Sequence, residues 1–144
     1  MSPPHHDTSP AAPERRRWIA AYLLLQALGG AAWWVGLMAE PRFLALFVPS
    51  TRGPEGLLTF WLADLALFVG GSALGAAATR GRWSSARPLL WAVAGATAYA
   101  ALWCVAQTIW TGEGWWCTLL MSPAALCTLA CAWGCPPCSN PSEP

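Results

Sequence analysis

A single acidic residue stands inside a long apolar stretch of the sequence. Asp64 lies in the run 57–79, roughly two helical turns from its start. A carboxylate in hydrocarbon costs at least about 2.5 kcal/mol on insertion scales, so it should face a bundle interior or a water-filled cavity, or be protonated. Such a group either transfers protons or fixes helix register through hydrogen bonds. Its candidate partners are polar and aromatic side chains of the other stretches: Gln107 first, then Tyr99, Trp103 and Gln26.

The C-terminal cysteines form the second group that could do chemistry. Of six cysteines, the last four follow one another at spacings of 4, 4 and 3 residues: Cys127, Cys131, Cys135 and Cys138. On a continuous helix these thiols would share one face, and thiolates bind Zn²⁺ or Cu⁺. Gly134 and the two prolines after Cys135 predict that the helix ends first. The remaining Cys-x-x-Cys motif suits a reversible disulfide or half a metal site, whereas the alternative is acylated or incidental cysteine.

Four long apolar stretches must position these residues. They lie at about residues 18–38, 57–79, 88–110 and 115–133. About 20 helical residues cross a hydrocarbon core about 30 Å thick. Hydrophobic residues make up 56% of the chain and charged residues 10%, and the charges fall almost entirely between the stretches. Because short connections favour antiparallel neighbours, the sequence predicts an all-α, integral membrane, four-helix up-down-up-down bundle.

Smaller features refine this bundle. Gly71 and Gly75 stand four residues apart, which is typical of a close contact between membrane helices. The apolar segment 41–49 is too short to span a membrane, so we expect it to lie on the outer membrane surface. We predict a disordered cytoplasmic tail over residues 1–14 and a short Cys/Pro tail over residues 135–144, with the bundle between them.

The distribution of arginine predicts the topology. All eight Lys and Arg residues are arginine, and six of them lie in two clusters, at residues 15–17 and 80–87. By the positive-inside tendency, both termini and the middle connection are cytoplasmic. We therefore expect a protein of the bacterial cell inner membrane with N and C termini cytoplasmic. The clusters are too small to suggest nucleic acid as a partner, and they suit anionic lipid.

Several runs of the sequence resemble the membrane segment of bacterial isoprenylcysteine methyltransferase-like proteins. The runs are WWVGL, PRFLALFVP, LADLALFVGGSALG, RWSSARPLLW, GATAYAALW and TGEGWWCTLLMSPA, and together they cover roughly residues 18–126. In that family the segment precedes a catalytic region rich in His, Arg, Glu and Pro, which transfers a methyl group from S-adenosylmethionine. Here the chain ends in CPPCSNPSEP instead. The resemblance therefore implies a shortened or stand-alone form of the non-catalytic half, and it carries over no catalytic residue.

These observations favour a multi-pass membrane protein with a structural or accessory role, no intrinsic catalytic site and no cofactor. Its expected partners are the lipid bilayer and either another membrane protein or a second copy of the chain. In this interpretation Gly71 and Gly75 pack helices, while Asp64 and Gln107 fix helix register. Two alternatives stay open. One is a small proton-coupled transporter that uses Asp64, and the other is a thiol or metal-handling membrane protein that uses the last four cysteines.

Overall fold

The computed structural model describes residues 11–48 and 53–136, and within them every regular element is a helix. In chain order the elements are α1 (Ala11–Ala39), α2 (Pro41–Ala45), α3 (Glu55–Leu58), α4 (Trp61–Ala63), the π-helix η1 (Asp64–Gly70), α5 (Gly71–Gly81), α6 (Ala86–Thr111) and α7 (Trp115–Gly134).

Four helical segments are long and apolar enough to cross a membrane. They are Ala12–Ala39, Glu55–Gly81, Ala86–Thr111 and Trp115–Gly134. Each matches one of the apolar stretches within a few residues, apart from an earlier start of the first. The all-α prediction is confirmed, and the four apolar helices fit a multi-pass membrane protein.

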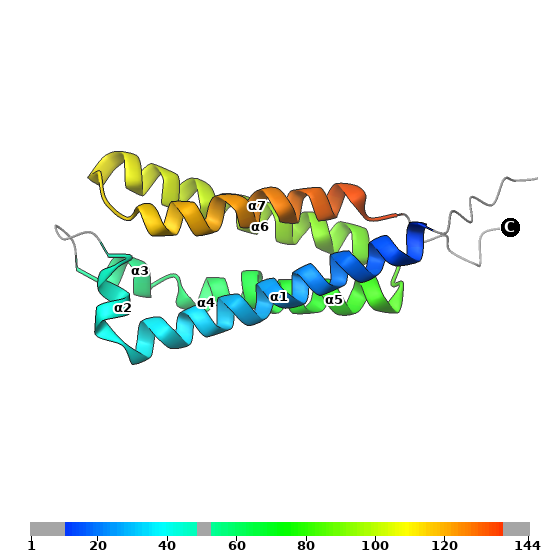
Figure 1. The fold of residues 1–144 in the computed structure, drawn as a ribbon, viewed down its shortest axis with the longest axis horizontal. Helices are drawn as coiled ribbons and strands as arrows, with labels where there is room; N and C mark the ends of the chain where they lie inside the picture. Colours follow the sequence, from blue (N-terminus) through cyan, green and yellow to red (C-terminus); the bar gives the residue numbers. More distant parts are fainter. Residues whose placement is uncertain (1–10, 49–52, 137–144) are drawn as a thin grey trace, which may run out of the picture.

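The helices form two antiparallel pairs. Helix α1 packs along α5 and η1, and α6 packs along α7, while α5 also contacts α6 (Figure 1). Gly112 and Gly114 have φ angles of 72° and 79° in the short connection between α6 and α7. Only glycine adopts this left-handed conformation without steric cost, which is why the second pair can turn so tightly.

At the end where α1 begins and α7 finishes, small side chains let the two pairs meet. Leu23, Leu90 and Ala132 come from three different helices and are 0% exposed there. Arg15 Nη1 donates to the Gly134 carbonyl oxygen at 3.5 Å, and Arg16 Nη2 donates to the Pro136 carbonyl oxygen at 3.3 Å. These arginines satisfy carbonyl groups at and just beyond the end of α7, where a positive charge also complements the helix dipole.

The start of α1 corrects one prediction. A disordered tail was expected through residue 14, but α1 begins at Ala11, so residues 11–14 are helical. Pro13 is tolerated there because the first turn of a helix has no carbonyl partner for its N–H groups. Glu14 also lies in the first turn, where the helix dipole favours a negative charge. Residues 1–10 and most of the predicted C-terminal tail lie outside the described residues.

The apolar segment after α1 folds back over the opposite end of the bundle. The Glu40 carboxylate accepts from the Arg42 backbone N–H at 3.1 Å and so caps α2, whose first residue is proline. Phe47 follows α2 and is 4% exposed, and it packs with Trp34, Leu37 and other residues of a second apolar cluster. We expected this segment to lie on the membrane surface, but part of it is buried against the bundle. It covers the end of the bundle opposite the start of α1 and the end of α7, which we call the α2 end. Residues 49–52 lie outside the described residues.

The second membrane-crossing segment is not one continuous α-helix, and its sequence did not predict this irregularity. It consists of α3, α4, the π-helix η1 and α5 in succession, and Asp64 is the first residue of the π-helix. π-helical turns are rare, and where they occur they are frequent at functional sites. The only acidic side chain within the four apolar stretches therefore stands where the helix changes its register.

A glycine pair on α1 tests the packing of the first helix pair. A Cβ atom on Gly30 would lie 2.8 Å from Phe68 Cε1 and 3.1 Å from Val69 Cγ2, whereas a Cβ on Gly29 would meet nothing within 4 Å. Gly30→Ala should therefore lower the melting temperature in detergent. Gly29→Ala should leave it unchanged or raise it, because alanine favours helix by up to about 1 kcal/mol. Equal effects of the two substitutions in a thermal unfolding assay would contradict this account of the contact.

Candidate ligand-binding cavity

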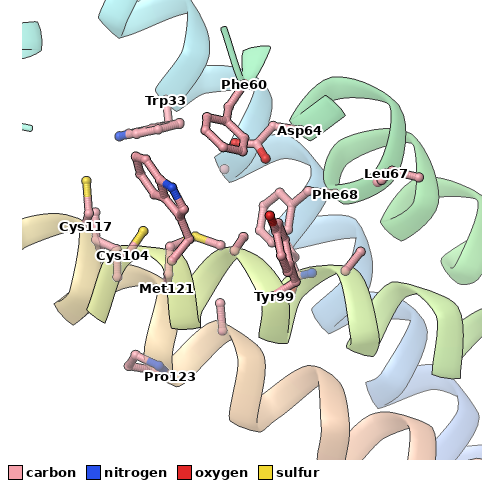
Figure 2. A pocket seen from close by; sticks show the side chains of 18 of the residues that line it. Trp33, Phe60, Asp64, Leu67, Phe68, Tyr99, Cys104, Cys117, Met121 and Pro123 are labelled. Atoms are coloured by element: carbon pink, nitrogen blue, oxygen red, sulfur yellow. The ribbon is translucent and has the colours of Figure 1, made fainter. Parts of the chain in front are cut away.

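A cavity of about 990 Å³ lies between the two helix pairs, toward the α2 end. Helices α1, α6 and α7 and the π-helix η1 supply most of its wall, and α2, α3 and α4 add one residue each. Most of the lining atoms are apolar, and the polar groups come from a few side chains. Figure 2 shows aromatic and sulfur-containing side chains converging on this space from opposite helices.

Asp64 supplies the only charged side chain of the lining. Its carboxylate interacts with the side chain of Trp34, which carries an indole N–H donor. Trp34 is 2% exposed and belongs to the apolar cluster at the α2 end, so the donor is held firmly. Across the parts of the chain that the structure describes, no arginine or histidine forms an ion pair with this carboxylate. Asp64 therefore faces the cavity with one fixed donor and no counter-ion.

Of the partners expected for Asp64, Tyr99 lines the cavity and Gln107 does not. Tyr99 lines the cavity from α6, and Figure 2 shows its hydroxyl group turned toward the side of the cavity on which Asp64 lies. Gln107 is not part of the lining, and its side chain makes no hydrogen bond to any residue in the described ranges. Its backbone carbonyl accepts from the Thr111 hydroxyl at 2.8 Å. The structure thus brings Tyr99 and Asp64 to one cavity and leaves Gln107 apart.

A hydrogen-bond network that includes the lining residues Tyr22 and Gln26 joins three helices. Gln26 Nε2 on α1 donates to Ser72 Oγ on α5 at 3.0 Å, and Thr128 Oγ1 on α7 donates to Gln26 Oε1 at 2.8 Å. Tyr22 adds a bond from its hydroxyl group to the Ala124 carbonyl at 3.0 Å. Sequence reasoning named Gln26 only as a partner for Asp64 and missed the other groups. The sequence feature that could have predicted this network is the presence of a small polar residue in each of several apolar stretches.

The two glycines predicted to pack helices both face neighbouring helices. A Cβ atom on Gly71 would lie 3.1 Å from Val93 Cγ2 on α6, and one on Gly75 would lie 3.4 Å from Leu23 Cδ1 on α1. The first contact is tight and the second is an ordinary van der Waals contact. Their role in assembly stays a prediction.

The cysteines divide between two regions. Cys104 and Cys117 face each other on α6 and α7, are both buried, and line the cavity. Cys127 also reaches the cavity, whereas Cys131 and Cys135 pack in the apolar cluster at the opposite end. Cys138 lies outside the described residues. Among the residues that are described, no three His, Cys, Asp or Glu side chains gather closely enough to hold a metal ion.

Comparisons with known proteins were made for the whole chain. No family model, curated protein or solved structure matches it. The resemblance to isoprenylcysteine methyltransferase-like proteins therefore stays a prediction from the sequence.

One further polar group in the cavity wall is unsatisfied. Trp33 lines the cavity, and its Nε1 atom is buried with no hydrogen-bond partner in the described structure. Its ring packs edge-on against Trp34 at 4.9 Å and against Phe47 at 5.6 Å between centroids. A buried N–H group without a partner costs free energy of folding. Such a group in a native protein calls for a functional explanation, such as a hydrogen bond to a bound ligand.

The network around Gln26 gives a test of how the pairs are joined. Gln26→Leu removes two interhelical bonds and leaves the buried Ser72 hydroxyl without its partner. At about 0.6 kcal/mol for a typical bond between membrane helices, plus the cost of the orphaned hydroxyl, we expect a loss of about 1 to 2 kcal/mol in unfolding free energy. Gln107→Leu is the matched control and should change stability little. A control that destabilises as much as Gln26→Leu would refute the special role of the network.

Proposed function

We propose that this multi-pass membrane protein has an accessory role in which it holds one lipid-sized, largely apolar molecule between its helix pairs and carries out no catalysis of its own. The cavity of about 990 Å³ is the observation that carries the proposal. Pockets for small molecules and cofactors generally measure about 300–1,000 Å³ and have apolar walls with a few placed polar groups. This cavity agrees with that description in size and in the chemistry of its lining.

The position of the cavity supports a ligand that arrives from the bilayer. Tyr99 lines the cavity and yet is 66% exposed, so the cavity reaches the surface of the bundle beside α6. That surface lies along an apolar helix that is long enough to cross a membrane. A molecule dissolved in the hydrocarbon core would therefore reach Asp64 without passing through water.

We also propose that both ends of the bundle chain face the cytoplasm, in a bacterial inner membrane. The support is the clustering of arginine at one end of the fold. Arg15 and Arg16 sit beside the end of α7, and the α5–α6 connection, which carries the second arginine cluster, lies at that same end (Figure 1). Positive charge gathered at one end is what the positive-inside tendency produces.

A proton-coupled carrier is the second candidate, and it rests on the position of Asp64. A carboxylate that faces the ligand cavity from the start of a π-helix could couple its own protonation to ligand movement. The cysteine alternative lacks comparable support, because the structure gathers no metal-binding group in the residues that it describes.

Filling the cavity tests the binding function. Gly29 lines the cavity with open space around it, and Gly95 is equally open but does not line it. We expect Gly29→Phe to weaken binding of a neutral pyrene-labelled alcohol, read out by energy transfer from tryptophan in nanodiscs, by about tenfold, because one aromatic side chain displaces much of the ligand. Gly95→Phe should bind like the wild type. Unaltered binding by Gly29→Phe, with both variants folded, would refute the proposal.

Transport is tested separately in proteoliposomes. If the protein is a carrier, an imposed proton gradient should drive uptake of the bound ligand, and Asp64→Asn should abolish the gradient-driven part while Glu113→Gln retains it. Binding without gradient-driven uptake would exclude the carrier and leave the accessory role.

A further inference from the structure

The charge balance of the cavity restricts the ligand further. Asp64 is its only charged lining residue, and the lining holds no arginine, lysine or histidine. A carboxylate offers about four acceptor positions, and among the described residues the Trp34 side chain is the donor that interacts with it. An ionised carboxylate in an apolar wall is costly unless a counter-ion pairs with it. The protein supplies no such counter-ion in residues 11–48 and 53–136, so a positively charged ligand group would fill the vacancy.

The cavity walls also favour a positively charged ligand group. Seven aromatic side chains line the cavity: Tyr22, Trp33, Phe43, Phe60, Phe68, Tyr99 and Trp103. Phe60 and Trp103 pack with ring centroids 4.8 Å apart, which brings the Asp64 side of the cavity into contact with α6. In Figure 2 the rings of Phe60 and Phe68 are drawn near Asp64, and the Tyr99 hydroxyl group points toward the same region from α6. The faces of aromatic rings carry negative charge density and attract organic cations, most strongly where water is excluded.

We propose that the cavity binds a lipophilic organic cation, of the quaternary ammonium or phosphonium class. Its charge pairs with Asp64, and its apolar substituents fill the space between the aromatic rings. This inference rests on the proposed function and specifies the ligand that the cavity takes.

Other ligand classes fit the same wall less well. A metal ion needs several oxygen, nitrogen or thiolate ligands together, and the described residues gather no such set. An anionic amphiphile would place like charges together in an apolar medium. A zwitterionic lipid would bring its phosphate along with its ammonium group, and a neutral molecule would leave Asp64 either protonated or without a counter-ion.

The test compares two ions of nearly equal size and shape but opposite charge. Tetraphenylphosphonium and tetraphenylborate would be titrated against the full chain in an uncharged detergent, with binding followed by equilibrium dialysis. Wild-type protein should bind the phosphonium at least about tenfold more tightly than the borate, because only the cation pairs with Asp64. Asp64→Asn should lose this preference. Glu113→Gln, the same change at a carboxylate outside the cavity lining, should retain it.

The outcomes separate this inference from the proposed function. If both ions bind equally, or if Asp64→Asn keeps the full preference, the cation inference is overturned while binding of apolar molecules stands. If neither ion binds and the neutral pyrene-labelled alcohol also fails to bind, the proposed function itself is overturned. Should Asp64→Asn not fold, Asp64→Glu serves instead. Retained preference in this charge-conserving variant supports the pairing, and loss of binding to both ions alike counts against it.

Discussion

The hydrogen bonds of Gln26 are the interaction on which the arrangement of the two helix pairs depends. Lipid tails are as apolar as leucine, so there is little hydrophobic force to hold α1 and α5 against α6 and α7. Direct contact between α1 and α7 is sparse, yet Gln26 reaches Ser72 on one side and Thr128 on the other. Thr128 and Ser72 are 0% exposed, so no solvent competes for these bonds. This network fixes the distance between the two helix pairs at the position of Gln26. Elsewhere along the bundle, the sizes of the facing side chains determine that distance.

Side-chain size explains why the space between the pairs closes at one end and stays open at the other. Near the ends of the chain the contacts are made by small residues such as Ala76, Ala94 and Ala132, and backbones approach closely. Toward the α2 end the lining residues include the large rings of Trp33, Phe60 and Trp103, and the tilted contact between Phe60 and Trp103 holds the backbones apart. The cap formed by Phe43 and Phe47 then covers the end of the opening. The result is an apolar cavity between the pairs that is covered at the α2 end.

The sequence predicted the parts of this structure that depend on local properties. Helix length and hydropathy are read directly along the chain, so the four spans and the all-α class could be predicted. The early start of α1 was missed because proline content suggested disorder, although Pro13 sits in a helix turn that tolerates it. The cavity could not be predicted, because it depends on contacts such as that between Gln26 and Thr128, which are 102 residues apart. Asp64 stood out by its charge, but its interaction with Trp34 could not be predicted, because indole donors give no distinctive signal in a sequence with eleven tryptophans.

The π-helix that begins at Asp64 makes the orientation of that carboxylate a property of the backbone and not only of the side chain. A π-turn holds more residues than an α-turn, so the seven residues of η1 rotate Asp64 relative to α5 by less than an α-helix of equal length would. Gly71 and Gly75 lie where α5 approaches α6 and α1, so the position of α5 gives the reference for that rotation. The direction in which Asp64 points from the helix axis therefore depends on the number of residues in η1. Losing one residue between 65 and 70 would turn the carboxylate away from the cavity while leaving the composition of both helix pairs almost untouched.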